Sequence, residues 1–215
     1  MAAKKAKKVQ EAISISPPDM RHIELDIEGI APLVINRMSQ KSINKMRATQ
    51  EAGSTAKGKK VREPRDFEED FKGAQYVSEE GWNGIHAGAF RNGAIGACRT
   101  VGFVMTHAKL GIFIEADGFD NIDGTPLVRI ISDDPPEMNV MPAKNDNGGT
   151  DLRSRPMWRR WGAKLRIRFD GGMFTTSDIV NLFSRVGLQG GICEGRPSSK
   201  KSAGLGWGLF KIVNA

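Results

Sequence analysis

The largest group of side chains able to bind an anion lies in residues 151–168, "DLRSRPMWRRWGAKLRIR". Arginine donates paired hydrogen bonds that match a phosphate group, and a tryptophan ring can stack on a nucleobase. The alternative is that Trp158 and Trp161 lie in the core and that the arginines form a solvated face. The candidate nucleic-acid ligands in this stretch are Arg153, Arg155, Trp158, Arg159, Arg160, Lys164 and Arg166.

A second candidate is the glycine-rich run "GLQGGICEGRPSSKKSAGLGWGLFKIV" at 187–213. Glycine tolerates positive φ and exposes its N–H group, so successive amides can turn toward one anion. The run is not a G-x-x-x-x-G-K-[ST] phosphate loop, because it precedes a strand-like ending and does not join a strand to a helix. We expect a loop that binds a sugar–phosphate backbone through Arg196, Lys200, Lys201, Gly204 and Gly206.

The histidines and cysteines are too dispersed to form a metal motif. His86 is the best candidate for acid–base work on RNA, with a structural or binding role as the alternative. Cys98 and Cys193 lack histidine or cysteine neighbours at ligand spacing, so we expect no zinc site and two reduced thiols. No metal and no cofactor is expected.

The first half of the chain contains a strand and two helices that would position these residues. Ile23, Leu25 and Ile27 alternate with acidic residues, which predicts a half-buried strand. Residues 39–52 are expected to form a helix with Ser39 as its N-cap. The stretch "GIHAGAFRNGAIGACRTVG" at 84–102 predicts a closely packed helix. Arg91 and Arg99 are eight residues apart, close to two turns, which predicts that they share one face of this helix.

The second half predicts strand, helix, glycine-rich loop and strand in that order. "KLGIFIEA" at 109–116 has the composition of a short strand, and residues 164–169 alternate apolar with cationic side chains. A helix is expected in 175–187, capped by Thr176 or Ser177 and followed by Gly187 as its C′ residue. "GWGLFKIV" at 206–213 is the predicted closing strand.

Three segments are expected to lie outside this core. Residues 1–20 are expected to form a basic flexible tail, and residues 21–215 are expected to form a single domain. Within that domain, 53–80 has almost no apolar periodicity and predicts a mobile loop. Residues 117–155 are rich in turn-forming residues and predict an extended insertion with hairpins.

The overall composition fits a basic protein with a polyanionic partner. The 215 residues are 39% hydrophobic and 27% charged, with a net charge of +7. No apolar run approaches the roughly 18–20 residues that a membrane span needs, so we expect no membrane partner and a cytoplasmic location. The alternative is a basic soluble protein without a nucleic-acid role.

The strand start, the helix "IHAGAFRNGAIGACR" and the late loop "GRPSSKKSAGLGWGLFKI" together resemble the RAMP superfamily of CRISPR-associated proteins. The chain also looks like small phage- or prophage-encoded proteins of the same arrangement. The resemblance implies an α+β, ferredoxin-like (RRM-like) core with an antiparallel sheet and a C-terminal glycine-rich loop. The family includes guide-RNA backbone subunits that assemble side by side, and endoribonucleases that process guide RNA. The first branch would use the loop with Arg91 and Arg99, and the second would use His86.

We therefore expect sequence-independent binding of single-stranded nucleic acid, RNA or DNA, by several copies lined up along the strand. One alternative is a metal-independent endoribonuclease that uses His86. Another is a phage protein that binds a host protein complex, in which case the location is the cytoplasm of the bacterial host.

Overall fold

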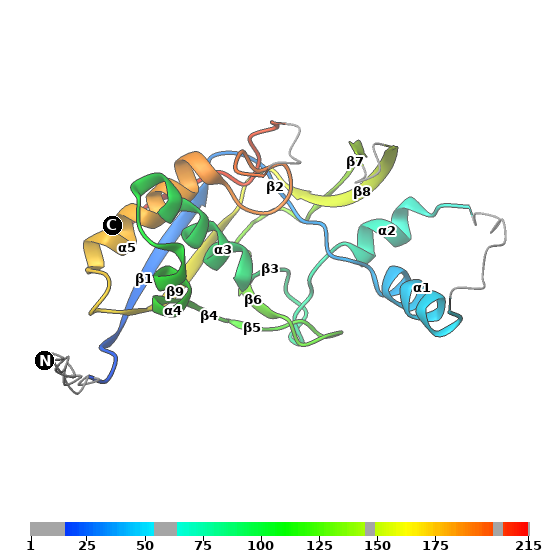
Figure 1. Cartoon of the computed structure of the whole chain (residues 1–215). Coiled ribbons are helices and arrows are strands. Elements are labelled where there is room, and N and C mark those ends of the chain that lie inside the picture. Colours follow the sequence, from blue (N-terminus) through cyan, green and yellow to red (C-terminus); the bar gives the residue numbers. More distant parts are fainter. Residues whose placement is uncertain (1–15, 54–63, 145–148, 200–203, 215) are drawn as a thin grey trace, which may run out of the picture.

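The structure is a computed structural model that describes residues 16–53, 64–144, 149–199 and 204–214 (Figure 1). The chain is α+β, with antiparallel sheets and five α-helices in the described residues. Lys200 and Lys201, two of the expected ligands, lie outside the described residues, as do residues 1–15 of the expected tail.

The main sheet has four strands in the order β10–β1–β9–β4, and every neighbouring pair is antiparallel. Its apolar face carries the alternating residues that the sequence indicates, among them Leu25, Leu165 and Phe169, all at most 1% exposed. These residues belong to one hydrophobic core that also includes residues of α3 and α5. The elements are β1 (Met20–Gly29), α3 (Ala87–Cys98), β4 (Ile112–Glu115), β9 (Gly162–Asp170), α5 (Thr176–Arg185) and β10 (Phe210–Ile212).

The predicted helix in 175–187 is present, but its ends differ from the prediction. Thr175 is the N-cap and forms a capping box with Asp178, because its side chain accepts from the N3 amide while Asp178 accepts in return. After α5 the chain continues as a π-helical turn, η2 (Val186–Gly190), and leaves it at Gly191 with φ 66°. Gly187 is therefore not the C′ residue; its bare α-carbon instead lets Phe210 pack against it.

The first insertion runs between β1 and α3 and contains β2 (Leu33–Val34), α1 (Gln40–Glu51), α2 (Phe67–Gly73) and β3 (Gly84–His86). Ser39 caps α1 as predicted, accepting from the amide of Ser42. Part of the loop expected in 53–80 is instead helix α2. Asp66 accepts from the amides of Glu68 and Glu69, and this N-cap compensates for weak apolar periodicity.

Between α3 and β4 lie η1 (Arg99–Val101) and α4 (Met105–Gly111), so the strand predicted at 109–116 begins only at Ile112. The second insertion separates β4 from β9 and contains the expected hairpins. These strands pair with the first insertion in two small sheets, β3–β6–β5 and β2–β8–β7. They are β5 (Gly118–Phe119), β6 (Pro126–Arg129), β7 (Glu137–Lys144) and β8 (Thr150–Trp158).

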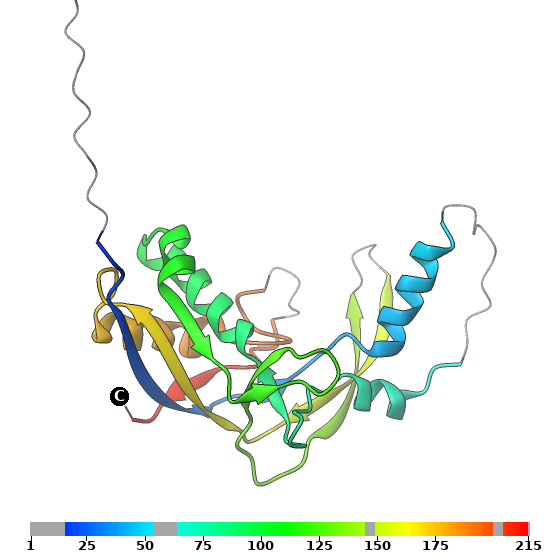
Figure 2. The ribbon, with the colours of Figure 1, turned by 90° about the horizontal axis from the view of Figure 1, so that it is seen from below.

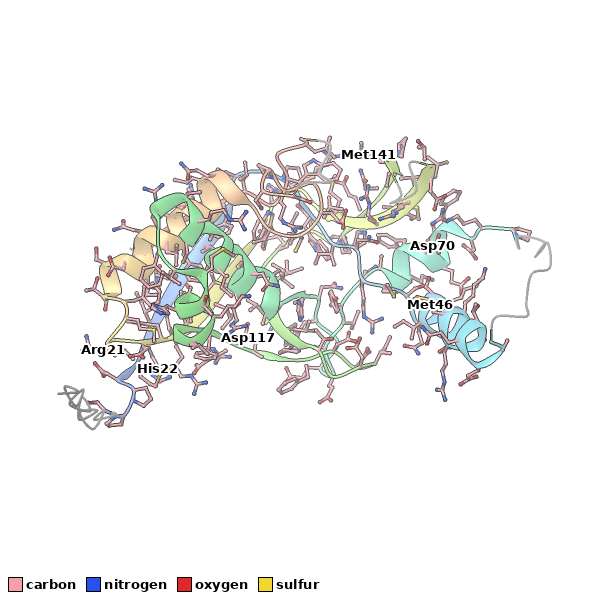
Figure 3. The ribbon with its side chains drawn as sticks, viewed as in Figure 1. Arg21, His22, Met46, Asp70, Asp117 and Met141 are labelled. Atoms are coloured by element: carbon pink, nitrogen blue, oxygen red, sulfur yellow. The ribbon has the colours of Figure 1, made fainter. Side chains whose placement is uncertain are left out.

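A buried ion pair joins the two insertions. Arg37 donates from Nη2 to Oδ2 of Asp120 at 2.8 Å and to Asp123 at 3.0 Å. The side chains of Arg37 and Asp120 are only 2% and 1% exposed. The ribbon curves, with the green helices α3 and α4 on one arm and the light-blue helix α1 on the other (Figure 2). Arg21 and His22 lie at one end of the molecule and Met46 and Asp70 at the opposite end (Figure 3).

Candidate nucleic-acid interface

A groove of about 620 Å³ lies between α3 and the glycine-rich segment that follows α5. These two parts of the chain are far apart in sequence, and they meet because η2 packs directly on α3. The α3 side of the groove is lined mostly by small residues, and the opposite side by the segment 189–198. The small residues are Ala89, Gly93, Gly96 and Ala97.

Two glycines of α3 have different roles in shaping this groove. A β-carbon on Gly93 would stand 2.8 Å from Cγ1 of Val186, so only glycine allows α3 to approach η2 this closely. A β-carbon on Gly96 would meet no atom within 4 Å. Gly96 therefore leaves open space in the groove although it lowers helix propensity by about 1 kcal/mol relative to alanine.

Three arginines from three different elements surround the groove: Arg99 of η1, Arg185 of α5 and Arg196 of the glycine-rich segment. Arg99 contacts the sulfur of Met105 at 3.8 Å, and Arg196 donates to the carbonyl of Cys193 at 2.7 Å. None of the three has a carboxylate partner among the described residues, and no Asp or Glu lines the groove there. The groove is therefore a concentration of uncompensated positive charge.

His86 stands at the edge of this groove, immediately before α3. Its ring stacks on Tyr76 with centroids 6.2 Å apart. Burial lowers the pKa of His86 below its ordinary value of 6.5, so the ring is neutral at pH 7. Among the described contacts it has no hydrogen bond to a carboxylate or hydroxyl, the partner that a general acid–base pair would require.

Cys193 also lines the groove, and it is the one non-glycine residue with positive φ, 58°, in the part of the chain that the structure describes. Burial of its thiol raises the pKa to about 12, so the sulfur stays protonated near neutral pH. The described residues contain no group of three or more His, Cys, Asp or Glu side chains that could hold a metal ion.

Trp158 and Arg155 were expected to bind nucleic acid, but both lie inside the protein, which corrects that prediction. Trp158 is 3% exposed and Trp161 4%, so neither offers a ring face to a base. The Arg155 side chain is 5% exposed and pairs with Glu194 at 3.2 Å, so it is not available to a phosphate. Buried side chains alternate with more exposed ones along β9, but residues 154–158 of β8 are all buried. Packing on both faces of β8 therefore covers side chains that the composition of the stretch predicts to be exposed.

Arg99 lines the groove, and Arg91 does not. Arg91 donates to the backbone carbonyls of Ile112 and Lys109, and thereby ties α3 to the end of α4. Arg99 lies beyond the end of α3, in η1, and lines the groove. The expected pair of phosphate contacts on one helix face is therefore wrong for Arg91, because two backbone carbonyls accept from its guanidinium.

The other cations predicted in 151–168 lie outside the groove. Arg159 pairs with Glu137 at 2.9 Å and Arg160 with Asp134 at 2.8 Å, both at the surface. Arg153 is half-buried on β8. The remaining two cations, Lys164 and Arg166, lie on the open face of the main sheet, close to acidic residues. Lys164 stands 3.7 Å from Glu24 and 3.8 Å from Asp26, and Arg166 bonds Asp117 at 2.8 Å.

In the glycine-rich segment the structure places Arg196 in the groove, while Gly204 and Gly206 precede β10 with φ of 69° each. That backbone conformation favours glycine, as the sequence suggests. Sequence reasoning missed Arg185, Asn92 and Gln189 as groove residues. Of these three, only Arg185 could have been found from the sequence, because it is a cation at the end of a predicted helix directly before the glycine-rich run.

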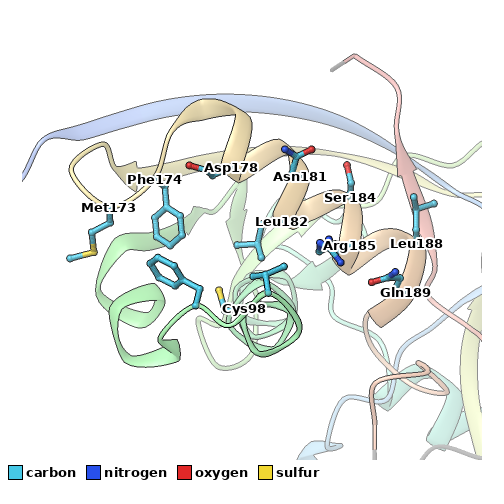
Figure 4. Close-up of a pocket in the computed structure, with 12 residues that line it drawn as sticks. Cys98, Met173, Phe174, Asp178, Asn181, Leu182, Ser184, Arg185, Leu188 and Gln189 are labelled. Atoms are coloured by element: carbon cyan, nitrogen blue, oxygen red, sulfur yellow. The ribbon is translucent and has the colours of Figure 1, made fainter.

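A second hollow, of about 700 Å³, lies on the other side of Arg185, between α5 and the end of α3 (Figure 4). Phe174, Leu182 and Cys98 point into it, and Asp178 is its one carboxylate in the described part of the chain. Its lining is mainly apolar, which does not suit a phosphate backbone. Arg185 and Gln189 border both hollows.

No protein-family model matches the chain, and no curated protein matches its sequence. None of the helices in the described ranges is both long enough and apolar enough to cross a membrane.

Proposed function

We propose that this protein binds single-stranded nucleic acid, RNA or DNA, in the groove between α3 and the glycine-rich segment. The observation that carries the proposal is the convergence of Arg99, Arg185 and Arg196 on a groove without a lining carboxylate among the described residues. Arginines elsewhere, such as Arg159 and Arg160, are paired with acids. Uncompensated arginines at a concave surface attract the phosphates of a polyanion.

The proposed binding is independent of sequence because phosphate contacts dominate it. Among the described residues that line the groove, the one aromatic ring is that of His86, and there is no tryptophan, tyrosine or phenylalanine. Stacking platforms for bases are thus scarce, whereas cations are plentiful. Asn92 and Gln189 offer amide groups to a passing strand without the fixed geometry of a base-reading site.

We further propose a ferredoxin-like core related to the RAMP superfamily. The strand order β10–β1–β9–β4, with α3 joining β1 to β4 and α5 joining β9 to β10, supports this topology. The glycine-rich segment lies between α5 and the last strand, as the resemblance implies. Assembly of several copies along the strand in the cytoplasm, and a phage origin, are parts of the same proposal.

The test compares two charge-matched triple variants by fluorescence anisotropy with labelled oligouridylate and oligothymidylate. The groove variant replaces Arg99, Arg185 and Arg196 by Gln. We expect a loss of affinity of about a hundredfold at low salt. The slope of log K against log[salt] should also become shallower by about 2, since each phosphate contact contributes about 0.7 for single strands.

The control variant replaces three exposed, acid-paired arginines by Gln: Arg21, Arg159 and Arg160. It removes the same total charge, so equal losses in the two variants would refute the groove as the site. Incubation of labelled RNA with the protein in the presence of EDTA tests the ribonuclease alternative. Cleavage that His86→Ala abolishes would replace the binding proposal by an enzymatic one.

A further inference from the structure

Arg155 has the chemistry of a phosphate ligand, yet its guanidinium lies inside the protein. Its Nη1 bonds Oε2 of Glu194 at 3.2 Å, and its side chain is 5% exposed. The guanidinium also lies 5.9 Å from the centre of the Trp207 ring. Burial lowers the pKa of Arg155 and the charge of Glu194 raises it, but an arginine remains cationic at any physiological pH.

These and neighbouring contacts fasten the glycine-rich segment to β2 of the first insertion and to β8 of the second. The amide of Glu194 donates to the carbonyl of Val34, and the amide of Trp207 donates to the carbonyl of Gly195. A β-carbon on Gly195 would stand 2.6 Å from the Trp207 ring, so the ring packs directly on this backbone. Trp207 forms a small apolar cluster with Val34 of β2 and Met157 of β8.

Glu194 is the acidic residue of this segment, and it sits between two residues that line the groove. Cys193 precedes it, and Arg196 follows two positions later. Its negative charge acts on the Cys193 thiol while Arg196 acts in the opposite sense. The charge of Glu194 would therefore reduce the attraction of the groove for a polyanion if Arg155 did not compensate it.

We infer that Arg155 is a positioning residue of the groove that acts through Glu194: its buried guanidinium neutralises the Glu194 carboxylate beside the groove. This inference rests on the proposed function of the groove. The affinity for nucleic acid thus depends on an arginine that the nucleic acid does not touch. The second insertion accordingly contributes to binding through its ion pair with the glycine-rich segment.

The experiment measures anisotropy with labelled oligouridylate for Arg155→Met, Glu194→Gln and the double variant, alongside thermal unfolding of each. We expect Arg155→Met to weaken binding about tenfold, because it exposes an uncompensated carboxylate beside the groove. Glu194→Gln should bind at least as tightly as the wild type. The double variant should return to within about twofold of wild-type affinity, since the two charges are removed together.

Other outcomes overturn the inference. If Arg155 touched phosphate, the double variant would remain as weak as Arg155→Met. If the pair only supported the fold, Glu194→Gln would weaken binding as much as Arg155→Met. Should Arg155→Met fail to fold, Glu194→Gln and the double variant still separate these cases. A wild-type protein that binds no oligonucleotide at low salt would refute the proposed function itself, whereas binding with an unchanged Arg155→Met refutes the inference alone.

Discussion

Gly93 of α3 and Val186 of η2 pack so closely that a β-carbon on the glycine would stand 2.8 Å from Cγ1 of the valine. This contact brings α3 against the start of the glycine-rich segment. The groove with Arg99, Arg185 and Arg196 lies along the same junction. One glycine therefore sets the distance between the two sides of the proposed binding site.

The two glycines of α3 should respond oppositely to alanine. Gly93→Ala should lower the free energy of unfolding by about 1–2 kcal/mol, because the overlap with buried Val186 outweighs the gain in helix propensity. Gly96→Ala should raise it by up to about 1 kcal/mol, because no atom lies within 4 Å. Urea denaturation followed by circular dichroism measures both, and a stabilised Gly93→Ala would contradict the packing described.

A large side chain at position 96 should obstruct the groove without harming the fold. We expect Gly96→Leu to reduce affinity for labelled oligouridylate about tenfold, while its unfolding free energy stays at or above that of the wild type. Gly96→Ala is the matched control and should bind nearly as the wild type does. Unchanged binding by Gly96→Leu would mean that the strand does not cross α3 here.

His86 should make both stability and binding depend on pH, with opposite signs. Its pKa in the folded protein is lowered by burial, so the unfolded chain holds the proton more tightly. The stability contribution is present above pH 6.5 and is lost as the pH falls toward the lowered pKa. Phosphate near the ring favours the protonated form, so affinity should rise between pH 7.5 and 5.5.

Matched histidine variants isolate this effect. Tyr76 stacks on His86 and the charge of Asp123 acts on it, whereas His22 is exposed beside Glu115. His86→Gln should remove the rise in affinity and flatten the pH dependence of Tm over this range, and His22→Gln should leave the affinity change intact. An identical pH profile in wild type and His86→Gln would place the responsible group elsewhere.

The buried pair between the two insertions should be essential to the fold. Arg37→Met leaves the Asp120 carboxylate, 1% exposed, without its cation, and we expect a loss of about 3–5 kcal/mol. Arg159→Met breaks an exposed pair with Glu137 and should cost less than about 1 kcal/mol. Urea denaturation compares the two, and similar losses would argue against a central role for Arg37.

The sequence predicted the parts of the fold that follow local rules. Alternation in β1 and β9 indicated strands with one apolar face, Ser39 indicated the start of α1, and the small residues of 84–102 indicated a closely packed helix. The α+β class was implied by the family resemblance that these elements carry, and the structure has that class. Helix α2 was missed because Asp66, and not apolar periodicity, defines its start.

The candidate site was predicted only in part. The glycine-rich segment, Arg99, Arg196 and His86 were identified, because glycine and cationic residues are visible in any single sequence. Trp158, Arg155 and Arg91 were assigned to the surface, although the structure buries or satisfies them. Composition cannot reveal which neighbour covers a side chain, since that neighbour comes from a distant segment.

The sequence by itself determined the local elements, the excess positive charge and the glycine-rich segment, because backbone propensity and side-chain charge are properties of single residues and short spacings. Tertiary structure decided which of the described arginines have an acidic partner and which do not. Arg155 meets Glu194 and Arg37 meets Asp120 across 39 and 83 positions, whereas Arg99, Arg185 and Arg196 gather without an acid among the described residues. Electrostatic attraction depends on distance in space, and only the packing of α3 on η2 sets the distances that form this groove.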